Sequence, residues 1–191
     1  MEEEIQLRPK ITLRRKQVET ITPSFKKMVV KLDWQSDVDL DLMVFYKAKN
    51  GDTGGVFSTL LGVDGSGGSL ENFPFIEHSG DVVGGNSDEK QESIKISALD
   101  NMAQVYVVVL NYEDAADNKT ANFGQYGGQV SIKTDAGDNL EVPLDSSEIG
   151  HVAIICAIDN TSGSPNLTNE NRILSLGAFI KEIPGSNLLL G

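Results

Sequence analysis

The sequence predicts an all-β protein, an antiparallel β-sandwich with long loops rich in glycine and aspartate. Three observations support this fold class. Apolar and polar residues alternate in several short segments, these segments recur with turn residues between them, and no long stretch has helical periodicity. With 191 residues, of which 39% are hydrophobic, the chain can bury a sizeable core. We expect one domain that spans residues 1–191.

The first predicted strands lie within residues 28–110. Met28–Trp34 and Ser93–Ser97 alternate apolar with polar residues, which is typical of strands with one buried face. Val105–Leu110 is apolar along its whole length, which indicates a central strand covered on both faces. Between these strands, ten of the nineteen glycines fall within residues 51–85, so we expect one long loop there that is suited to a function.

The remaining strands follow in the carboxy-terminal half. Gln129–Thr134 and Asn139–Leu144 flank a short turn that contains Gly137, and they predict a hairpin. The last two strands are expected over Val152–Ile158 and Arg172–Ile183, joined by a polar loop. Regular strands with turns between them favour a sandwich.

The net charge of −12 is distributed unevenly. Residues 1–31 contain eight of the sixteen basic residues and four acidic ones, a balance of +4, so the rest of the chain carries −16. Such a body is a poor partner for nucleic acid, because affinity for phosphates comes mainly from lysine and arginine. Arg14, Arg15 and Lys16 suit contact with an anionic surface, such as the acidic face of another subunit. The alternative is a solvated strand edge.

The sequence gives no sign of membrane insertion. It contains no run of 18 apolar residues, and Met1-Glu2-Glu3-Glu4 is the opposite of the basic start of a secretory signal. We therefore expect a soluble, cytoplasmic protein. The single cysteine, Cys156, lies in an apolar strand and is expected to pack as a small buried hydrophobic residue.

One loop, residues 80–92, has the composition of a calcium site. It combines three glycines with the oxygen-bearing side chains Asp81, Asn86, Asp88, Glu89 and Glu92. Glycines let the backbone turn tightly, and Ca²⁺ prefers several hard oxygen ligands. The alternative is a solvated acidic turn between two strands.

Two other acidic segments are candidates for ligands. Asp37, Asp39 and Asp41 are spaced by two residues, so we expect their side chains on one face of a strand, where a cation would relieve their repulsion. Residues 113–118 contain Glu113, Asp114 and Asp117 and follow the predicted central strand. Loops at strand ends often carry ligands, although most are only solvated turns.

These segments together resemble the TerD-like family of tellurite-resistance and stress-response proteins. The resemblance covers most of the chain. It includes the Asp39-Leu40-Asp41 strand, the 80–92 loop, the strand after it, and Asn122–Gln125. It implies a β-sandwich that binds Ca²⁺ in acidic loops, with Asp39, Asp41, Asp81, Asp88 and Glu92 at positions that match the family. Together with Asn86 and Glu89, which the composition of the loop suggests, these residues are the predicted metal ligands.

The resemblance is incomplete in the proposed metal loop. Lys90 and Gln91 occupy positions that are usually aspartate in the family, and Val82 replaces a polar residue. Loss of two carboxylates and gain of an ammonium group imply weakened calcium binding, or loss of a site.

The predicted function is therefore non-enzymatic calcium binding linked to tellurite resistance or stress response. The two histidines, His78 and His151, are not part of any recognisable catalytic arrangement, and no phosphate loop or zinc motif is present. The alternative is a structural subunit of a cytosolic complex or a phage particle that keeps this fold while its metal site decays. We expect self-association or protein partners in either case, with location in the virion if the alternative holds.

Overall fold

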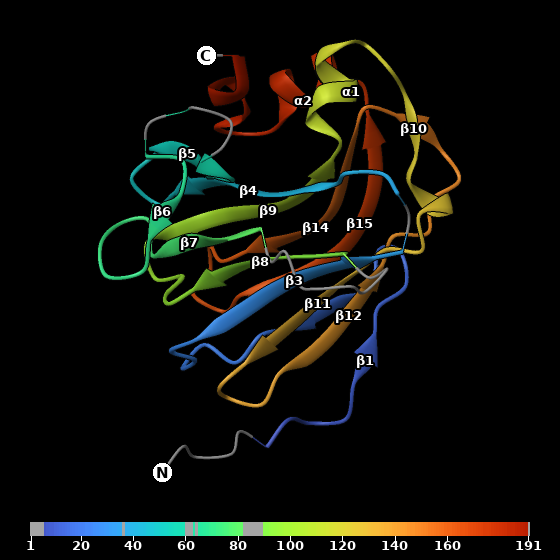
Figure 1. Cartoon of the computed structure of the whole chain (residues 1–191). Coiled ribbons are helices and arrows are strands. Elements are labelled where there is room, and N and C mark those ends of the chain that lie inside the picture. The colour runs from blue at the N-terminus through green and yellow to red at the C-terminus, as the bar shows by residue number, and fades with distance from the viewer. Residues whose placement is uncertain (1–5, 36, 60–62, 64, 82–89, 191) are drawn as a thin grey trace.

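The structure, a computed structural model, describes residues 6–35, 37–59, 63, 65–81 and 90–190, with the backbone alone described at residues 80 and 81. Within these residues the chain forms two large sheets that pack face to face, so the predicted all-β sandwich is confirmed (Figure 1). All strand pairs in the two large sheets are antiparallel except β1 with β12.

Sheet A has seven strands, and sheet B has six. The order in sheet A is β1 (Ile11–Thr12), β12 (Asn139–Pro143), β11 (Gln129–Thr134), β3 (Met28–Trp34), β8 (Lys90–Ile96), β7 (Ile76–Asp81) and β6 (Gly68–Ser69). The order in sheet B is β2 (Val18–Thr20), β15 (Asn166–Leu174), β14 (Val152–Asp159), β9 (Met102–Leu110), β4 (Asp41–Ala48) and β5 (Thr53–Val56). A small separate sheet pairs β10 (Ala121–Asn122) with β13 (Ile149–Gly150).

The main core fills the space between the two sheets. Alternate residues of β3, from Met28 to Trp34, face this core and are buried, while Val29, Lys31 and Asp33 face the opposite side of sheet A. This is the alternation that the sequence predicts for a strand with one buried face. The same rule places Ile94 and Ile96 of β8 in the core.

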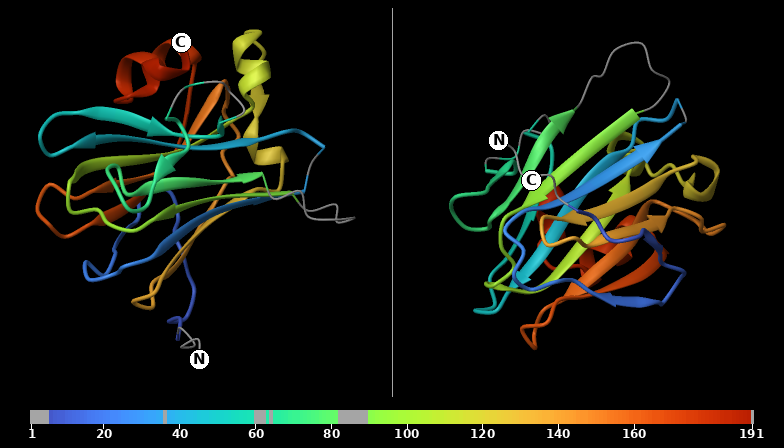
Figure 2. Two further views of the ribbon diagram at one scale, coloured as in Figure 1. Left: turned by 60° about the vertical axis from the view of Figure 1, so that its left-hand side comes forward. Right: turned by 90° about the horizontal axis from the view of Figure 1, so that it is seen from below.

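Sheet B is covered on its other face as well. Met43 and Phe45 of β4 belong to a second apolar cluster that also contains Phe179 and Ile183 from the carboxy-terminal segment. The Phe45 and Phe179 rings meet edge to face with 5.4 Å between their centroids. Figure 2 shows the resulting three layers, with helices above sheet B and sheet A below it.

The prediction of a final strand over Arg172–Ile183 is correct only for residues 172–174 and wrong beyond them, and the strand itself begins earlier, at Asn166. Strand β15 ends at Leu174, and helix α2 (Leu176–Glu182) follows, with η3 (Ser186–Leu190) after it. The Ser175 side chain accepts a hydrogen bond from Ala178 N and caps the helix. Leu176, Phe179, Ile180 and Ile183 also have helical spacing, so the signal was present in the sequence. In the described part of the chain, no helix is long and apolar enough to span a membrane.

The glycine-rich segment 51–85 is not one continuous loop. It contains β5 and β6, and β7 ends within it. Gly54 and Gly55 of β5 lie directly against the Tyr46 and Phe45 rings, where an added Cβ would lie within 3 Å of ring atoms. Several of these glycines therefore serve close packing within a sheet rather than loop flexibility.

The amino-terminal segment links the two sheets at one side of the sandwich. It pairs with sheet A through β1 and with sheet B through β2, and it buries Leu13 between them. Asn169 of β15 donates from Nδ2 to Leu13 O (2.8 Å), and its Oδ1 accepts from Asn171 Nδ2 (2.8 Å). Asn171 Nδ2 also donates to Pro143 O of sheet A (2.8 Å). This buried amide pair joins the layers by hydrogen bonds instead of apolar contact.

Asp138 anchors the same segment to the β11–β12 hairpin. Its carboxylate accepts hydrogen bonds from Thr22 N (3.1 Å), Thr22 Oγ1 (3.0 Å) and Thr134 Oγ1 (2.6 Å). Arg8 lies 3.5 Å away, and the Asp138 side chain is only 4% exposed. The sequence marks Asp138 only as a turn residue, yet it holds a distant segment in place.

Cys156 is buried in β14 at the centre of sheet B, as the sequence predicts. Burial raises the pKa of its thiol, and the Glu170 carboxylate adds to the effect. The neutral thiol therefore packs as a hydrophobic group.

We predict that Asp138→Ala lowers the free energy of unfolding by about 2–4 kcal/mol, because it leaves buried donors without an acceptor. Urea denaturation followed by circular dichroism would measure this change. Asp145→Ala, at an exposed position, is the matched control and should change stability by less than about 0.5 kcal/mol. Equal effects of the two variants would contradict the anchoring role.

Candidate metal-binding site

The structure brings two of the acidic segments together at one end of the sandwich. Strand β3 ends at Trp34, and the chain returns as β4 at Asp41; β7 ends at Asp81, and β8 begins at Lys90. Trp34 pairs with Lys90 in sheet A, and Leu42 N at the start of β4 contacts Glu92, so these strand ends lie near one another. Asp81 is the cross-strand partner of Glu92.

Glu92 points into the sandwich. It alternates with Ile94 and Ile96 on the inward face of β8, and its side chain is 3% exposed. Its Oε2 accepts a hydrogen bond from Leu42 N of sheet B (2.5 Å), and its Oε1 lies 3.4 Å from His78 Nε2. Glu92 thus joins β8 to the start of β4 across the two layers.

His78 is the partner of Glu92 that the sequence does not suggest. It lies in β7 directly opposite Ile94, and its side chain is also buried. No spacing links residues 78 and 92, so only the pairing of β7 with β8 reveals this contact. The inward position of Glu92, by contrast, could have been deduced from its alternation with the two isoleucines.

The sequence predicts that Asp37, Asp39 and Asp41 lie on one face of a strand, and this prediction is wrong. Asp41 opens β4, whereas Asp37 and Asp39 precede it and are exposed. Trp34 Nε1 donates to Val38 O (2.7 Å), which holds residues 37–40 against the end of β3. Asp37 and Asp39 are exposed, so water screens the repulsion between their carboxylates.

Asp41 connects the site to the third acidic segment. Its Oδ2 accepts a hydrogen bond from Tyr112 N (3.0 Å), at the start of α1 (Tyr112–Ala116). Residues 113–116, expected as part of a loop, form this short helix, which Asn111 caps by accepting from Asp114 N. Glu113 on this helix and Asp117 at its carboxy-terminal cap are exposed.

The Lys90 side chain, at the start of β8, reaches the segment that contains Asp37. Its Nζ donates a hydrogen bond to the carbonyl of Asp37 (3.2 Å). Gln91, its neighbour, lies on the opposite side of β8 and lines a polar hollow with Asp33 and Gln129 on the outer face of sheet A. The two positions that depart from the family pattern therefore face different surroundings.

Part of the predicted ligand set lies outside the described residues. These ligands are Asn86, Asp88 and Glu89, and for Asp81 only the backbone is described. Within the described ranges, no group of three or more His, Cys, Asp or Glu residues is arranged to hold a metal ion. Asp39, Asp41 and Glu92 thus approach the same end of the sandwich without forming a complete site by themselves.

The remaining groups with catalytic potential are held in structural contacts. His151 accepts a hydrogen bond through Nδ1 from Leu176 N (2.9 Å) at the start of α2. Cys156 is fully buried, and its raised pKa disfavours the reactive thiolate.

Comparisons with known proteins add no relative to this description. The chain matches no protein-family model, no curated protein and no solved structure.

Proposed function

We propose that this protein is a non-enzymatic calcium-binding protein, of the kind that its resemblance to TerD-like stress-response proteins implies. One observation carries the proposal. Residues 37–42 and the start of β8, distant in sequence, meet at one end of the sandwich through the contacts of Glu92 with Leu42 and of Lys90 with Asp37. This juxtaposition brings the 80–92 loop to the same end as Asp37, Asp39 and Asp41, and the carboxylates of both segments would supply the several oxygen ligands that Ca²⁺ requires.

Calcium fits these residues better than other metal ions. The candidate ligands are all oxygens, and the loop contains no Cys or His, which zinc prefers. A glycine-rich loop also adapts more easily to the irregular, large coordination shell of Ca²⁺ than to the strict octahedron of Mg²⁺. His78 is committed to Glu92, which suits a supporting role beside the site.

We predict that millimolar Ca²⁺ raises the melting temperature of protein first stripped with chelator, because an ion that binds only the native state stabilises it. Asp81→Ala and Asp88→Ala should each abolish most of this shift. Differential scanning fluorimetry over a series of Ca²⁺ and Mg²⁺ concentrations would measure it.

Asp100→Ala is the matched control for these ligand variants. Asp100 is exposed in the connection between β8 and β9, at the opposite end of β8 from the proposed site. Asp138 would be a poor control, because its removal should destabilise the fold itself. If Asp100→Ala reduced the shift as strongly as the ligand variants, the response would be general charge screening.

The two departures from the family pattern provide a second test. We predict that Lys90→Asp tightens calcium binding by about tenfold or more, since it changes the charge beside Asp37 by two units. Gln91→Asp should change affinity by only about threefold, because residue 91 faces the outer surface of sheet A. Isothermal titration calorimetry would measure the calcium affinity of both variants. A larger change in affinity for Gln91→Asp than for Lys90→Asp would mean that the ion binds elsewhere.

A structural subunit of a larger assembly is the second candidate. Residues 6–18 contain five basic residues and no acidic one, and Leu7, Ile11 and Val18 are exposed large hydrophobic side chains. A basic and partly apolar strip on an acidic protein suits contact with an acidic partner, including another copy of this chain.

We predict for this candidate that the protein self-associates in chelator at low salt, and that replacing Arg14, Arg15 and Lys16 together with glutamine dissociates it. Light scattering coupled to size-exclusion chromatography would give the mass. A monomer at all salt concentrations that also binds calcium in the micromolar range would reject the assembly role.

A further inference from the structure

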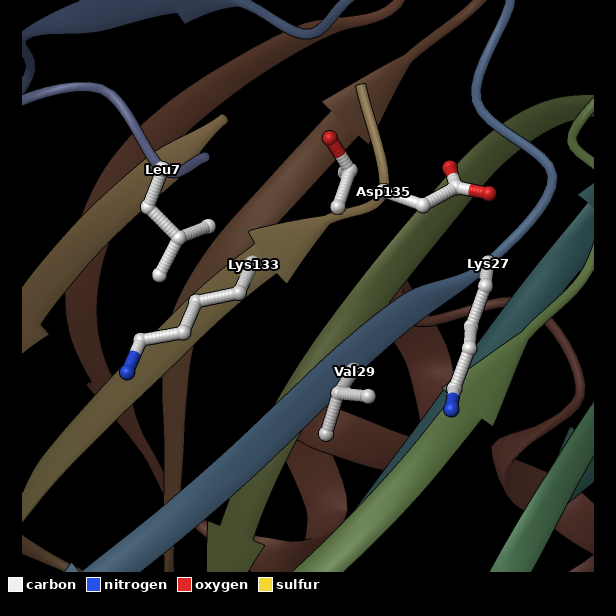
Figure 3. A pocket seen from close by; sticks show the side chains of 6 residues that line it. Leu7, Lys27, Val29, Lys133 and Asp135 are labelled. Atoms are coloured by element: carbon white, nitrogen blue, oxygen red, sulfur yellow. The ribbon is translucent and has the colours of Figure 1, made fainter. Parts of the chain in front are cut away.

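The outer face of sheet A has a small hollow beside the β11–β12 turn. Its volume is about 180 Å³, and Figure 3 shows the side chains that surround it. The lining residues are Leu7, Lys27, Val29, Lys133, Thr134 and Asp135. They come from three segments: the amino-terminal segment, the start of β3 with the residue before it, and the end of β11 with its turn. The hollow is remote from Glu92, which points to the other side of sheet A.

The centre of the hollow is apolar. Val29 faces outward from β3 and lies between the Lys27 and Lys133 side chains (Figure 3). Lys133 is its cross-strand partner on β11, and Lys95 is its partner on β8. Leu7 adds a second apolar side chain, which is 40% exposed. Two aliphatic groups on an open sheet face are a surface that an apolar ligand group would cover favourably.

Cationic groups border this apolar centre. In the described part of the chain, Lys27 and Lys133 form no ion pair, while Lys95 lies opposite Glu77. The lining contains one carboxylate, Asp135, whose Oδ1 accepts a hydrogen bond from Lys26 N (2.9 Å). Lys27, Lys133 and Asp135 together give the lining a charge of +1, on a chain whose net charge is −12.

The walls of the hollow are fixed by hydrogen bonds. Asp135 N donates to Lys27 O (3.0 Å), and Lys26 N donates to the Asp135 carboxylate, so two hydrogen bonds tie the turn to the two residues before β3. Arg8 N donates to Gly137 O (2.9 Å), which holds the neighbouring Leu7 against the same turn. A ligand would therefore meet a preformed surface, and little ordering entropy would oppose binding.

We propose that this hollow binds a small amphiphilic monoanion, a carboxylate joined to a short apolar group. The lysines would contact the carboxylate, and Val29 and Leu7 would cover the apolar group. A lining charge of +1 matches one negative charge better than the two charges of a phosphate monoester. The volume is below the roughly 300 Å³ of typical ligand pockets, so the hollow suits a small molecule or one end of a longer one.

Octanoate is the probe for the experiment, with protein kept in chelator so that the result is independent of the calcium proposal. We expect saturable binding in chemical-shift titrations, with shifts at Val29 and Leu7. Octanol, which lacks the charge, and acetate, which lacks the chain, should each bind at least about tenfold more weakly. Octyl phosphate separates the two anion chemistries: equal or tighter binding than octanoate would overturn the preference for a carboxylate.

Variants locate the site. Lys27→Gln and Lys133→Gln should each weaken octanoate binding by about three- to tenfold, and their exposed positions leave the fold intact. Lys47→Gln, at an exposed lysine of sheet B, is the matched control and should leave the affinity unchanged. Equal losses in all three variants, or no saturable binding by the wild-type protein at tens of millimolar, would overturn the proposal.

Discussion

The double burial of sheet B is the constraint on which the rest of the structure depends. Its central strands β4, β9 and β14 carry apolar residues on both faces, so sheet A alone cannot cover them. The carboxy-terminal segment supplies the second cover by forming α2 and η3, with Phe179 against Phe45. Sheet A has no such requirement, and its outer face stays open and, apart from the hollow around Val29, largely polar. The two faces of the molecule are therefore chemically different, although both belong to one sandwich.

Much of the fold was predictable because strand alternation depends on local sequence. The strands over Met28–Trp34 and Val105–Leu110 and the hairpin at Gly137 follow from two-residue periodicity and turn chemistry. The predicted strand over Arg172–Ile183 includes the helix after Leu174, because its apolar residues were assigned to a strand although Leu176, Phe179 and Ile183 have helical spacing. Segment 51–85 was misjudged because glycine content does not distinguish loops from strands packed closely on aromatic rings.

The candidate site shows where local sequence stops being informative. Acidic composition identified segments 37–42 and 80–92, and the described residues of the second segment, at the end of β7 and the start of β8, lie at the same end of the sandwich as the first. The contacts that join them depend on tertiary pairing: His78 meets Glu92 because β7 lies beside β8, and Asp41 meets Tyr112 because β4 pairs with β9. Equally, nothing in the turn around Asp138 indicates that it anchors Thr22, which is 116 residues away.

The reactivity of the buried Cys156 thiol measures how often the core of the protein opens. It lies in β14, between β9 and β15 in the middle of sheet B, and it is the single cysteine of the chain. A thiol reagent can reach it only when the core between the two sheets opens, because Cys156 belongs to that core and burial both blocks access and keeps the sulfur protonated. Loss of the amino-terminal segment or fraying of α2 would leave β14 paired on both sides. The rate of thiol modification therefore measures opening of the core between the sheets, and local opening at either end of the chain should leave that rate unchanged.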